Sequence, residues 1–399
     1  MFHRLLAPFL RKAASRYPVV TVTGPRQSGK TTLVKTTFKS HEYVSLELPD
    51  QRRMALEDPR GFLRRFKGPA IIDEAQRAPE IFSYIQANVD EDARPGRFIL
   101  TGSQNFLLLQ NISQSLAGRC AILHLLPLSL GELSGASAAP PEAWGRPISP
   151  RRRGTWRKKL AKTLFAGFYP RIHDQKLPPQ EWLANYYQTY LERDVRNVLQ
   201  VGDLETFGRF VRLCAGRSGQ ILNLSGLASD CGVTHTTAKR WISVLEASFL
   251  ILLLRPYHNN FGKRLIKNPK LYFLDTGLLC YLLRVGSPEE LNSHAARGAV
   301  FESFIVSELV KNFIHRGQKP EVYFWRDSKG HEIDFLIDFG GRLVPMEAKS
   351  GETVAADFFN SLNYWKALPG QKDAPAVLVY GGDAAFTHAG SAVYPWFAL

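Results

Sequence analysis

The stretch that decides the fold is Val19-Val-Thr-Val-Thr-Gly24-Pro-Arg-Gln-Ser-Gly29-Lys30-Thr31-Thr32. Its β-branched beginning predicts a strand, and the pattern G-x-x-x-x-G-K-[ST] predicts a phosphate-binding loop that opens a helix. Glycines let backbone N–H groups converge on phosphate oxygens, and the start of the helix adds its positive end. We expect Lys30 to reach the β- and γ-phosphates of ATP, and the Thr31 hydroxyl to bind Mg²⁺. The predicted nucleotide-binding residues are Gly24, Pro25, Arg26, Gln27, Ser28, Gly29, Lys30, Thr31 and Thr32.

Polar residues follow two further apolar runs. Asp73 and Glu74 end the run 70–72, where parallel α/β sheets bind ligands. Asp73 is predicted to hold the Mg²⁺ of ATP and Glu74 to polarise the attacking water. After the run 98–101, Ser103 is the best candidate to orient that water, with Thr101 and Asn105 as alternatives.

An arginine that completes the nucleotide site of a neighbouring subunit has two candidates. Arg119 lies in Ser115-Leu-Ala-Gly-Arg119, and Arg193 lies in Tyr190-Leu-Glu-Arg-Asp194. The alternative for each is a surface or ion-paired arginine. We take Arg119 as the catalytic candidate.

The chain of 399 residues is long enough for two or three domains. Short apolar runs at 19–23, 43–46, 70–72, 98–101 and 121–125 alternate with helical stretches, which predicts a parallel α/β sheet. Proline, alanine and glycine crowd residues 134–154 and predict a linker that is free to move. The expected domains are an ATPase domain (1–133), the linker (134–154), a helical lid (155–215), a winged-helix-like domain (216–292) and a C-terminal domain (293–399).

The net charge indicates the kind of partner to expect, and the cysteine content indicates the cellular compartment. The net charge is +15, from 51 Lys and Arg against 36 Asp and Glu, and it favours a polyanion such as DNA over an inert basic surface. Four dispersed cysteines fit a reducing compartment, so a cytoplasmic location is expected. The longest apolar run, 249–254, is too short to span a membrane, and apolar positions in residues 2–10 have the spacing of an amphipathic helix.

Residues 224–245 have the pattern helix, glycine turn, helix, with apolar positions typical of a helix-turn-helix. Apolar runs near 249–254 and 270–274 are expected to form the wing of a winged helix. The alternative is a module that only packs against the rest of the protein. Predicted DNA contacts on the second helix are Thr236, Lys239 and Arg240, with Thr234, His235 and Thr237 beside them and Lys263, Arg264 and Lys267 extending the basic patch.

Two alternating stretches, 331–338 and 343–349, flank Gly340-Gly341, which suits a two-residue hairpin turn. That turn fixes the register, so Asp334 lies opposite Glu347 and Glu332 opposite Lys349. Facing carboxylates repel, and Mg²⁺ or Mn²⁺ would offset the repulsion. The alternative is an exposed hairpin with a Glu332–Lys349 ion pair and no chemistry.

The arrangement D…E-x-K at Asp334, Glu347 and Lys349 resembles the PD-(D/E)XK nuclease-like fold, without its proline before Asp334. That resemblance implies acidic metal ligands, an assisting lysine and a further ligand from an earlier helix, which Glu302 matches. Whether the site cleaves DNA stays open.

The chain as a whole resembles a prokaryotic family of AAA+ type ATPases with this C-terminal domain, once of unknown function. The resemblance rests on G-P-R-Q-x-G-K-T-T at residues 24–32, D-E-x-Q at 73–76 and T-G-S at 101–103, with further matches through residue 349. It implies a homo-oligomer, such as a hexameric ring, that remodels or translocates duplex or branched DNA. The open alternatives are an ATP-regulated, metal-dependent nuclease and a nucleotide-dependent signalling or defence switch that binds a protein.

Overall fold

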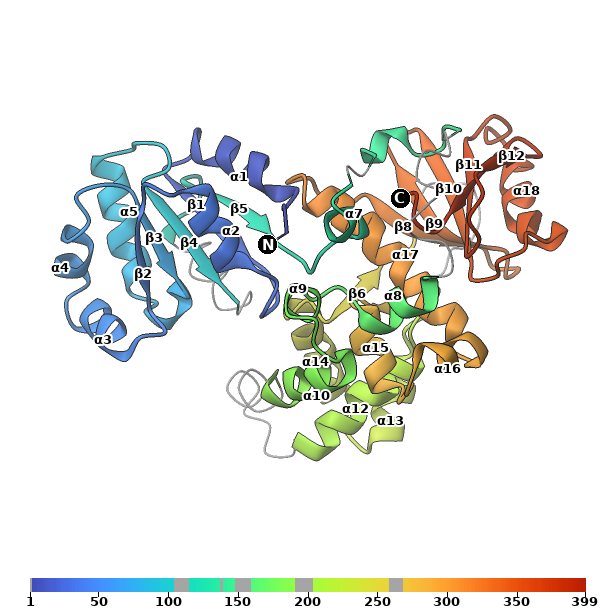
Figure 1. Cartoon of the computed structure of the whole chain (residues 1–399), viewed down its shortest axis with the longest axis horizontal. Coiled ribbons are helices and arrows are strands. Elements are labelled where there is room, and N and C mark those ends of the chain that lie inside the picture. Colours follow the sequence, from blue (N-terminus) through green and yellow to red (C-terminus); the bar gives the residue numbers. More distant parts are fainter. Residues whose placement is uncertain (1, 104–114, 137–138, 148–158, 191–203, 258–267) are drawn as a thin grey trace. The chain divides into compact units, whose positions relative to one another are not determined.

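The computed structural model describes residues 2–103, 115–136, 139–147, 159–190, 204–257 and 268–399. The chain divides into two compact units. The first comprises Met1–Leu128 with the short segments Ala247–Phe249 and Phe313–Lys319, and the second comprises the remaining residues (Figure 1).

The first unit is built on a five-stranded parallel sheet in the order β2-β3-β4-β1-β5. All five predicted strands are confirmed to within about a residue at their ends. Because β4 lies between β1 and β3, the carboxyl end of β4 lies between the ends of the strands that carry the phosphate loop and the Asp73 and Glu74 carboxylates. The strands are β1 (Val19–Thr23), β2 (Glu42–Ser45), β3 (Ala70–Asp73), β4 (Phe98–Gly102) and β5 (Cys120–His124).

Helices cover both faces of this sheet, and alternation along the strands divides the core in two (Figure 1). Ile71 and Ile99 face one helical layer, whereas Ile72 and Leu100 face the other. The predicted N-terminal amphipathic helix is present and belongs to the first layer. That layer is α1 (Leu6–Ala14) and α2 (Lys30–Thr37), and the other is α3 (Pro49–Glu57), α4 (Pro59–Arg64) and α5 (Ile81–Glu91).

The second unit begins with helices, and two of them, with a glycine turn between them, lie where the sequence predicts helix, turn and helix. Helix α13 (Leu224–Cys231) ends at Gly232, whose φ of 70° lies in the left-handed region that favours glycine, and α14 (His235–Ala247) follows. Strands β6 (Ile251–Leu254) and β7 (Lys270–Phe273) then pair in antiparallel fashion. The other helices before the C-terminal sheet are α7 (Leu130–Ser134), α8 (Leu160–Ala166), α9 (Pro170–Asp174), α10 (Pro179–Tyr190), α12 (Leu204–Gly216), α15 (Thr276–Leu282), α16 (Pro288–Ser293) and α17 (Arg297–Ile314).

The C-terminal part of this unit is a mixed six-stranded sheet in the order β12-β13-β11-β10-β9-β8. Strands β8 to β10 are antiparallel neighbours, whereas β10, β11 and β13 run parallel. The chain after β6 joins β8, because Tyr257 N–H donates to the Phe324 carbonyl at 2.7 Å. The elements are β8 (Val322–Arg326), β9 (Glu332–Asp338), β10 (Leu343–Lys349), α18 (Asn360–Lys366), β11 (Ala376–Tyr380), β12 (Phe386–His388) and β13 (Ser391–Pro395).

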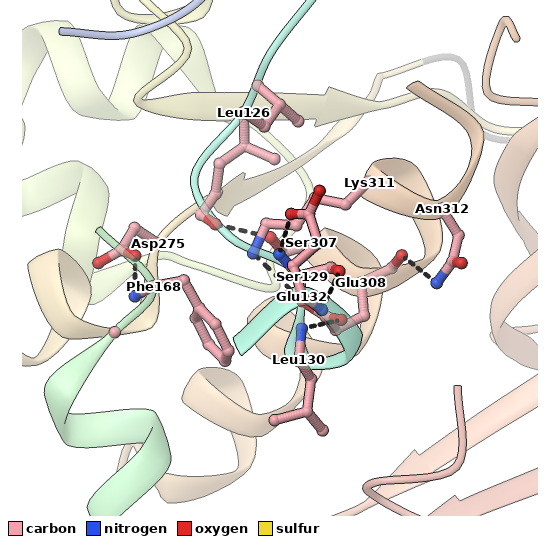
Figure 2. A network of polar contacts seen from close by, with 12 residues as sticks. Leu126, Ser129, Leu130, Glu132, Phe168, Asp275, Ser307, Glu308, Lys311 and Asn312 are labelled. Carbon is pink, nitrogen blue, oxygen red and sulfur yellow. Dashed lines mark hydrogen bonds and ion pairs between the residues drawn. The ribbon is translucent and has the colours of Figure 1, made fainter. Parts of the chain in front are cut away.

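A buried polar network ties α7 to α17 in this unit (Figure 2). The Glu308 carboxylate accepts the Leu130 N–H at 2.8 Å and pairs with Lys311 at 3.2 Å, and both side chains are at most 1% exposed. Burial raises the pKa of Glu308, whereas the Lys311 charge lowers it. Helix α7 itself begins in a reciprocal cap between Ser129 and Glu132.

This network involves the end of the predicted ATPase domain, 1–133. The first compact unit ends at Leu128, and α7 is anchored on α17 within the second unit. Residues 139–147 of the predicted linker are held by packing and hydrogen bonds rather than free to move. Trp144 is 1% exposed, and the Arg342 guanidinium donates to the Glu142 carbonyl at 3.0 Å. Residues 148–154 of that linker lie outside the described residues.

No helix within the described ranges is both long and apolar enough to cross a membrane.

Candidate functional site

The phosphate loop has the backbone that the sequence predicts. Gly24 has a φ of 152°, and a Cβ there would lie 2.1 Å from the Leu125 carbonyl oxygen. Gly29 has a φ of 92° directly before α2, and Gln27 also has a positive φ of 62°. Positive φ values turn successive N–H groups toward one side, which is how a backbone forms an anion-binding concavity. The loop therefore lies at the carboxyl end of β1 and at the N-terminus of a helix, as a phosphate site requires.

Lys30 is folded back onto this loop. Its buried ammonium donates to the Gly24 carbonyl at 3.0 Å and the Pro25 carbonyl at 2.8 Å. When a nucleotide binds, the Lys30 ammonium would exchange these carbonyls for phosphate oxygens. The phosphate-binding role of Lys30 stays a prediction.

Asp73 collects three hydroxyl groups at the end of β3. The Thr31 hydroxyl donates to its two carboxylate oxygens at 3.0 and 3.1 Å, and the Tyr43 hydroxyl donates at 3.0 Å. The Thr101 hydroxyl also donates to Asp73. Burial and the Asp73 carboxylate raise the pKa of Tyr43 to about 12, so its hydroxyl remains a donor at neutral pH. A carboxylate and a hydroxyl oxygen in contact form a donor set that suits Mg²⁺, and Thr31 with Asp73 would hold it.

Glu74 lies beside Asp73 in a left-handed conformation, with a φ of 55°. Its carboxylate accepts from the Ser103 hydroxyl at 3.0 Å and from the Gln76 amide at 2.5 Å. A non-glycine residue in this region carries backbone strain, which is common where a side chain must be aimed at a reaction. Of the candidates to orient the water, Ser103 contacts the Glu74 carboxylate, whereas the Thr101 hydroxyl contacts the Asp73 carboxylate and accepts the Glu74 N–H at 3.4 Å. The third, Asn105, lies outside the described residues.

The arrangement suits ATP hydrolysis. Main-chain N–H groups of the loop and Lys30 would bind the phosphates, and Glu74 would orient and deprotonate the attacking water. Magnesium, when bound, neutralises charge that develops on the phosphate oxygens. Hydrogen bonds from Ser103 and Gln76 hold the Glu74 carboxylate in place for this task.

Arg119, the arginine candidate that the structure describes, does not lie at this site within the first unit. Arg119 precedes β5 at the amino-terminal ends of the strands, whereas the phosphate loop lies at their carboxyl ends, and the Arg119 guanidinium pairs with Asp90 at 2.9 Å. This pairing is the ion-paired alternative, and it raises the pKa of Arg119. A role in a neighbouring subunit would first require that this exposed pair separate. Arg193 lies outside the described residues.

Helix α14 presents one exposed polar face. Thr236, Lys239 and Arg240 are exposed at helical spacing, while Trp241 and Leu245 are buried on the other face. Thr234 caps the helix instead, since its hydroxyl oxygen accepts the Thr237 N–H at 3.1 Å. His235 is exposed beside these residues, and Lys263, Arg264 and Lys267 lie outside the described residues.

The C-terminal hairpin has the predicted turn and register. Gly340 and Gly341 have φ values of 68° and 101°, and Phe339 N–H donates to the Arg342 carbonyl at 3.1 Å. Pairs run from Leu343 with Asp338 to Met346 with Phe335, in the predicted register. Beyond these pairs, main-chain N–H groups donate to side-chain carboxylates. Ala348 N–H donates to the Asp334 carboxylate at 3.0 Å, and Asp334 N–H donates to the Glu347 carboxylate at 3.3 Å.

Lys349 lies between the two carboxylates. Its ammonium is 2.8 Å from a Glu347 oxygen and 3.5 Å from an Asp334 oxygen, and the side chain is 34% exposed. Burial, followed by the Asp334 charge, raises the pKa of Glu347 to about 8. The alternative of a Glu332–Lys349 ion pair in an exposed hairpin is wrong. Strand β9 is mostly buried, and Glu332 pairs with Lys270 and Arg326 instead.

Glu302 of α17 belongs to the same electrostatic cluster. Burial first, then Asp334, raises its pKa to about 7, and the Tyr272 hydroxyl donates to it at 3.2 Å. Burial lowers the pKa of Lys270, but the Glu332, Asp334 and Glu302 carboxylates raise it to a net value above normal. Among the residues that the structure describes, no three acidic, histidine or cysteine side chains are arranged to hold a metal ion. Metal binding by Glu302, Asp334 and Glu347 therefore stays a prediction.

Several contacts were not expected from sequence. Tyr43 was seen only as part of a strand, and its hydroxyl contact with Asp73 had no signal beyond strand alternation. Lys270 and Tyr272 alternate on β7, so their common face was foreseeable but their acidic partners were not. Arg4 lies outside the phosphate-binding motif, yet its guanidinium donates to the Ser28 carbonyl of the phosphate loop.

The fold and the site define an AAA-type P-loop ATPase domain in the first unit, and comparison with known proteins agrees. A family model described as an AAA domain matches residues 16–134. Two domains of unknown function, DUF8612 and DUF4143, match residues 157–289 and 297–399. The chain is 32% identical to the uncharacterized protein Rv2008c of Mycobacterium tuberculosis, over 94% of this chain and 79% of that protein. The uncharacterized protein Mb2031c of Mycobacterium bovis has the same values. The chain belongs to the family of these mycobacterial proteins.

Solved structures show more distant similarity. The Walker-type ATPase PABY2304 of Pyrococcus abyssi is 14% identical, with a TM-score of 0.40 over 69% of this chain and 94% of that chain. RuvB of Thermotoga maritima is 20% identical, with a TM-score of 0.26 over 62% of this chain and 87% of that chain. The ATPase assignment rests on the AAA-domain match over residues 16–134 and on the geometry of the site.

Proposed function

We propose that the protein is an oligomeric, DNA-binding AAA+ ATPase that uses ATP hydrolysis to remodel or translocate duplex or branched DNA, such as junctions. The observation that carries the DNA assignment is the exposed face of α14. Thr236, Lys239 and Arg240 occupy that face, directly after a glycine turn. A second helix of a helix-turn-helix with such a face is suited to phosphates or base edges.

The strands beside α14 support this proposal. Segment 219–222 precedes α13 and joins β7, since Gly219 N–H donates to the Leu271 carbonyl at 2.7 Å and Leu222 N–H donates to the Pro269 carbonyl at 2.8 Å. The order of elements is therefore α12, the extended segment 219–222, α13, α14 and the antiparallel strands β6 and β7. A winged helix has the same order. The net charge of +15 favours a polyanionic partner, and charge of this kind governs salt-sensitive binding.

The test measures ATP turnover with and without duplex, single-stranded and four-way-junction DNA, and binding of each across salt concentrations. We expect stimulation by at least one of these DNAs. Lys239→Ala should weaken binding and reduce the slope of log affinity against log salt by about one, the effect of one lost phosphate contact. Lys12→Ala, which removes an exposed lysine from α1, is the matched control.

Absence of DNA stimulation together with absence of salt-sensitive binding would refute the DNA assignment. Capture of a protein instead of DNA from lysate would then favour the nucleotide-dependent switch.

A second candidate function, ATP-regulated cleavage of DNA, is favoured by the cluster near the beginning of β9 and the end of β10. Asp334, Glu347 and Lys349 are in mutual contact there, as in a PD-(D/E)XK nuclease-like site. Asp334 and Glu347, with Glu302, offer the oxygen ligands that Mg²⁺ or Mn²⁺ takes. Lys349 would assist the attacking water.

Lys349→Ala should abolish Mg²⁺-dependent nicking and leave ATP turnover unchanged. Lys329→Ala, at an exposed turn before β9, serves as the control. If the wild-type protein cuts none of the DNA structures with Mg²⁺ or Mn²⁺, cleavage is excluded as the function.

A further inference from the structure

An arginine outside the phosphate-binding motif contacts the phosphate loop. Arg4 precedes α1 and is 7% exposed. Its Nη1 donates to the Ser28 carbonyl at 2.6 Å, and its Nη2 donates to the Leu126 carbonyl at 2.7 Å. Both are short, charge-assisted hydrogen bonds, the stronger kind in proteins.

The contact with Ser28 has a consequence for the next N–H group. The peptide between Ser28 and Gly29 is planar and trans, so the Gly29 N–H points away from the Ser28 carbonyl. Arg4 holds that carbonyl on one side and thereby directs the Gly29 N–H to the other. Gly29 is the last residue before α2, where a phosphate site draws its backbone donors.

The contact with Leu126 joins the loop to the segment that leaves β5. The Leu125 carbonyl oxygen lies 2.1 Å from where a Cβ on Gly24 would be, so this segment bears directly on the loop. Leu126 is held from its other side as well, because its N–H donates to the His315 ring nitrogen Nε2 at 3.2 Å. Arg4 thus connects the loop at Ser28 to an anchored segment that also contacts the loop at Gly24.

We infer that Arg4 is a positioning residue for the nucleotide, which presets the phosphate loop by holding the Ser28 and Leu126 carbonyls together. It acts through the Gly29 N–H rather than by touching the reacting atoms. Its effect is therefore on nucleotide binding in ground and transition states alike, which changes KM and leaves kcat nearly constant. A lysine keeps the charge but lacks the two-pronged geometry, so it restores only part of the effect.

The experiment compares Arg4→Gln and Arg4→Lys with the full-length wild-type chain. Arg11→Gln removes an exposed arginine from α1 and is the matched control. Binding of a fluorescent ATP analogue with Mg²⁺ gives Kd, and steady-state turnover gives KM and kcat. We expect Kd and KM to rise about tenfold in Arg4→Gln and about threefold in Arg4→Lys, with kcat within about twofold of wild type. Arg11→Gln should match wild type.

Wild-type Kd and KM in both Arg4 variants would overturn the inference, even if their melting temperatures fall. If Arg4→Gln does not fold, Arg4→Lys decides, and an unchanged Kd in that variant overturns it. The inference rests on nucleotide binding at residues 24–32 and not on DNA. A wild-type chain that binds the analogue but no DNA refutes only the proposed DNA function, whereas one that does not bind the analogue refutes this inference.

Discussion

The ATPase site and the C-terminal acidic cluster both place carboxylates and a lysine at strand ends, but they satisfy these charges differently. Asp73 and Glu74 accept hydrogen bonds from neutral hydroxyl and amide groups, and Lys30 is folded onto carbonyls of its own loop. In the C-terminal cluster, Lys349 pairs directly with Asp334 and Glu347.

The two sites therefore differ in the contacts that a bound ligand would have to replace. At the ATPase site Asp73 and Glu74 accept hydrogen bonds from hydroxyl and amide groups, which a cation or a water molecule can replace. At the C-terminal cluster the charges neutralise one another, and burial with mutual repulsion raises the pKa of Glu347 to about 8 and of Glu302 to about 7. A cation there must displace the lysine, protons or both.

The largest expected effect is on ATP turnover, which should depend on the ATPase site and not on the C-terminal cluster. Glu74→Gln should lower ATP turnover about a hundredfold or more with ATP binding retained, because the amide cannot accept a proton from water. Glu347→Gln should leave turnover at the wild-type level. Phosphate release measures both, with Glu80→Gln, at an exposed position before α5, as the control. A loss in Glu347→Gln as large as that in Glu74→Gln would contradict the independence of the sites.

A smaller effect is the dependence of stability on pH. A raised pKa means that folded Glu302 keeps a proton that the unfolded chain releases, so its contribution to stability is present below its normal value of 4.5 and is lost as pH rises to about 7. As the pH rises over that range, the free energy of unfolding of wild type should therefore fall by on the order of 3 kcal/mol more than that of Glu302→Gln. Urea unfolding measured as a function of pH checks this, with the exposed Glu289→Gln on α16 as control. Parallel profiles for wild type and Glu302→Gln would show that Glu302 does not titrate as proposed.

The smallest expected effect tests the neutral hydroxyls of the ATPase site. Tyr43→Phe removes one hydrogen bond to Asp73, worth about 1 kcal/mol, and leaves that carboxylate less well oriented. The Mg²⁺ concentration for half-maximal ATP turnover should rise by about threefold. Tyr272→Phe, which removes the corresponding hydrogen bond to Glu302, should leave it unchanged. Equal shifts in both variants would mean that the two sites are not separate.

Most of the first unit and the C-terminal hairpin could be predicted because their signals are local. Strands 19–23 and 98–101 follow from apolar, β-branched runs, and the phosphate loop follows from glycine positions whose φ values are positive in the structure. The hairpin register follows from two glycines in one turn, since a two-residue loop allows one pairing.

Side-chain partners depended on tertiary structure instead. The sequence by itself determined that a phosphate loop, two carboxylates and a D…E-x-K hairpin exist, because backbone periodicity and turn chemistry act over a few residues. Only the tertiary structure decided that Glu332 pairs with Lys270, that Trp144 is buried in a segment expected to be free, and that Arg4 holds Ser28. Each of these contacts joins residues more than about twenty positions apart, where several partners have the right charge or shape and three-dimensional packing selects one of them.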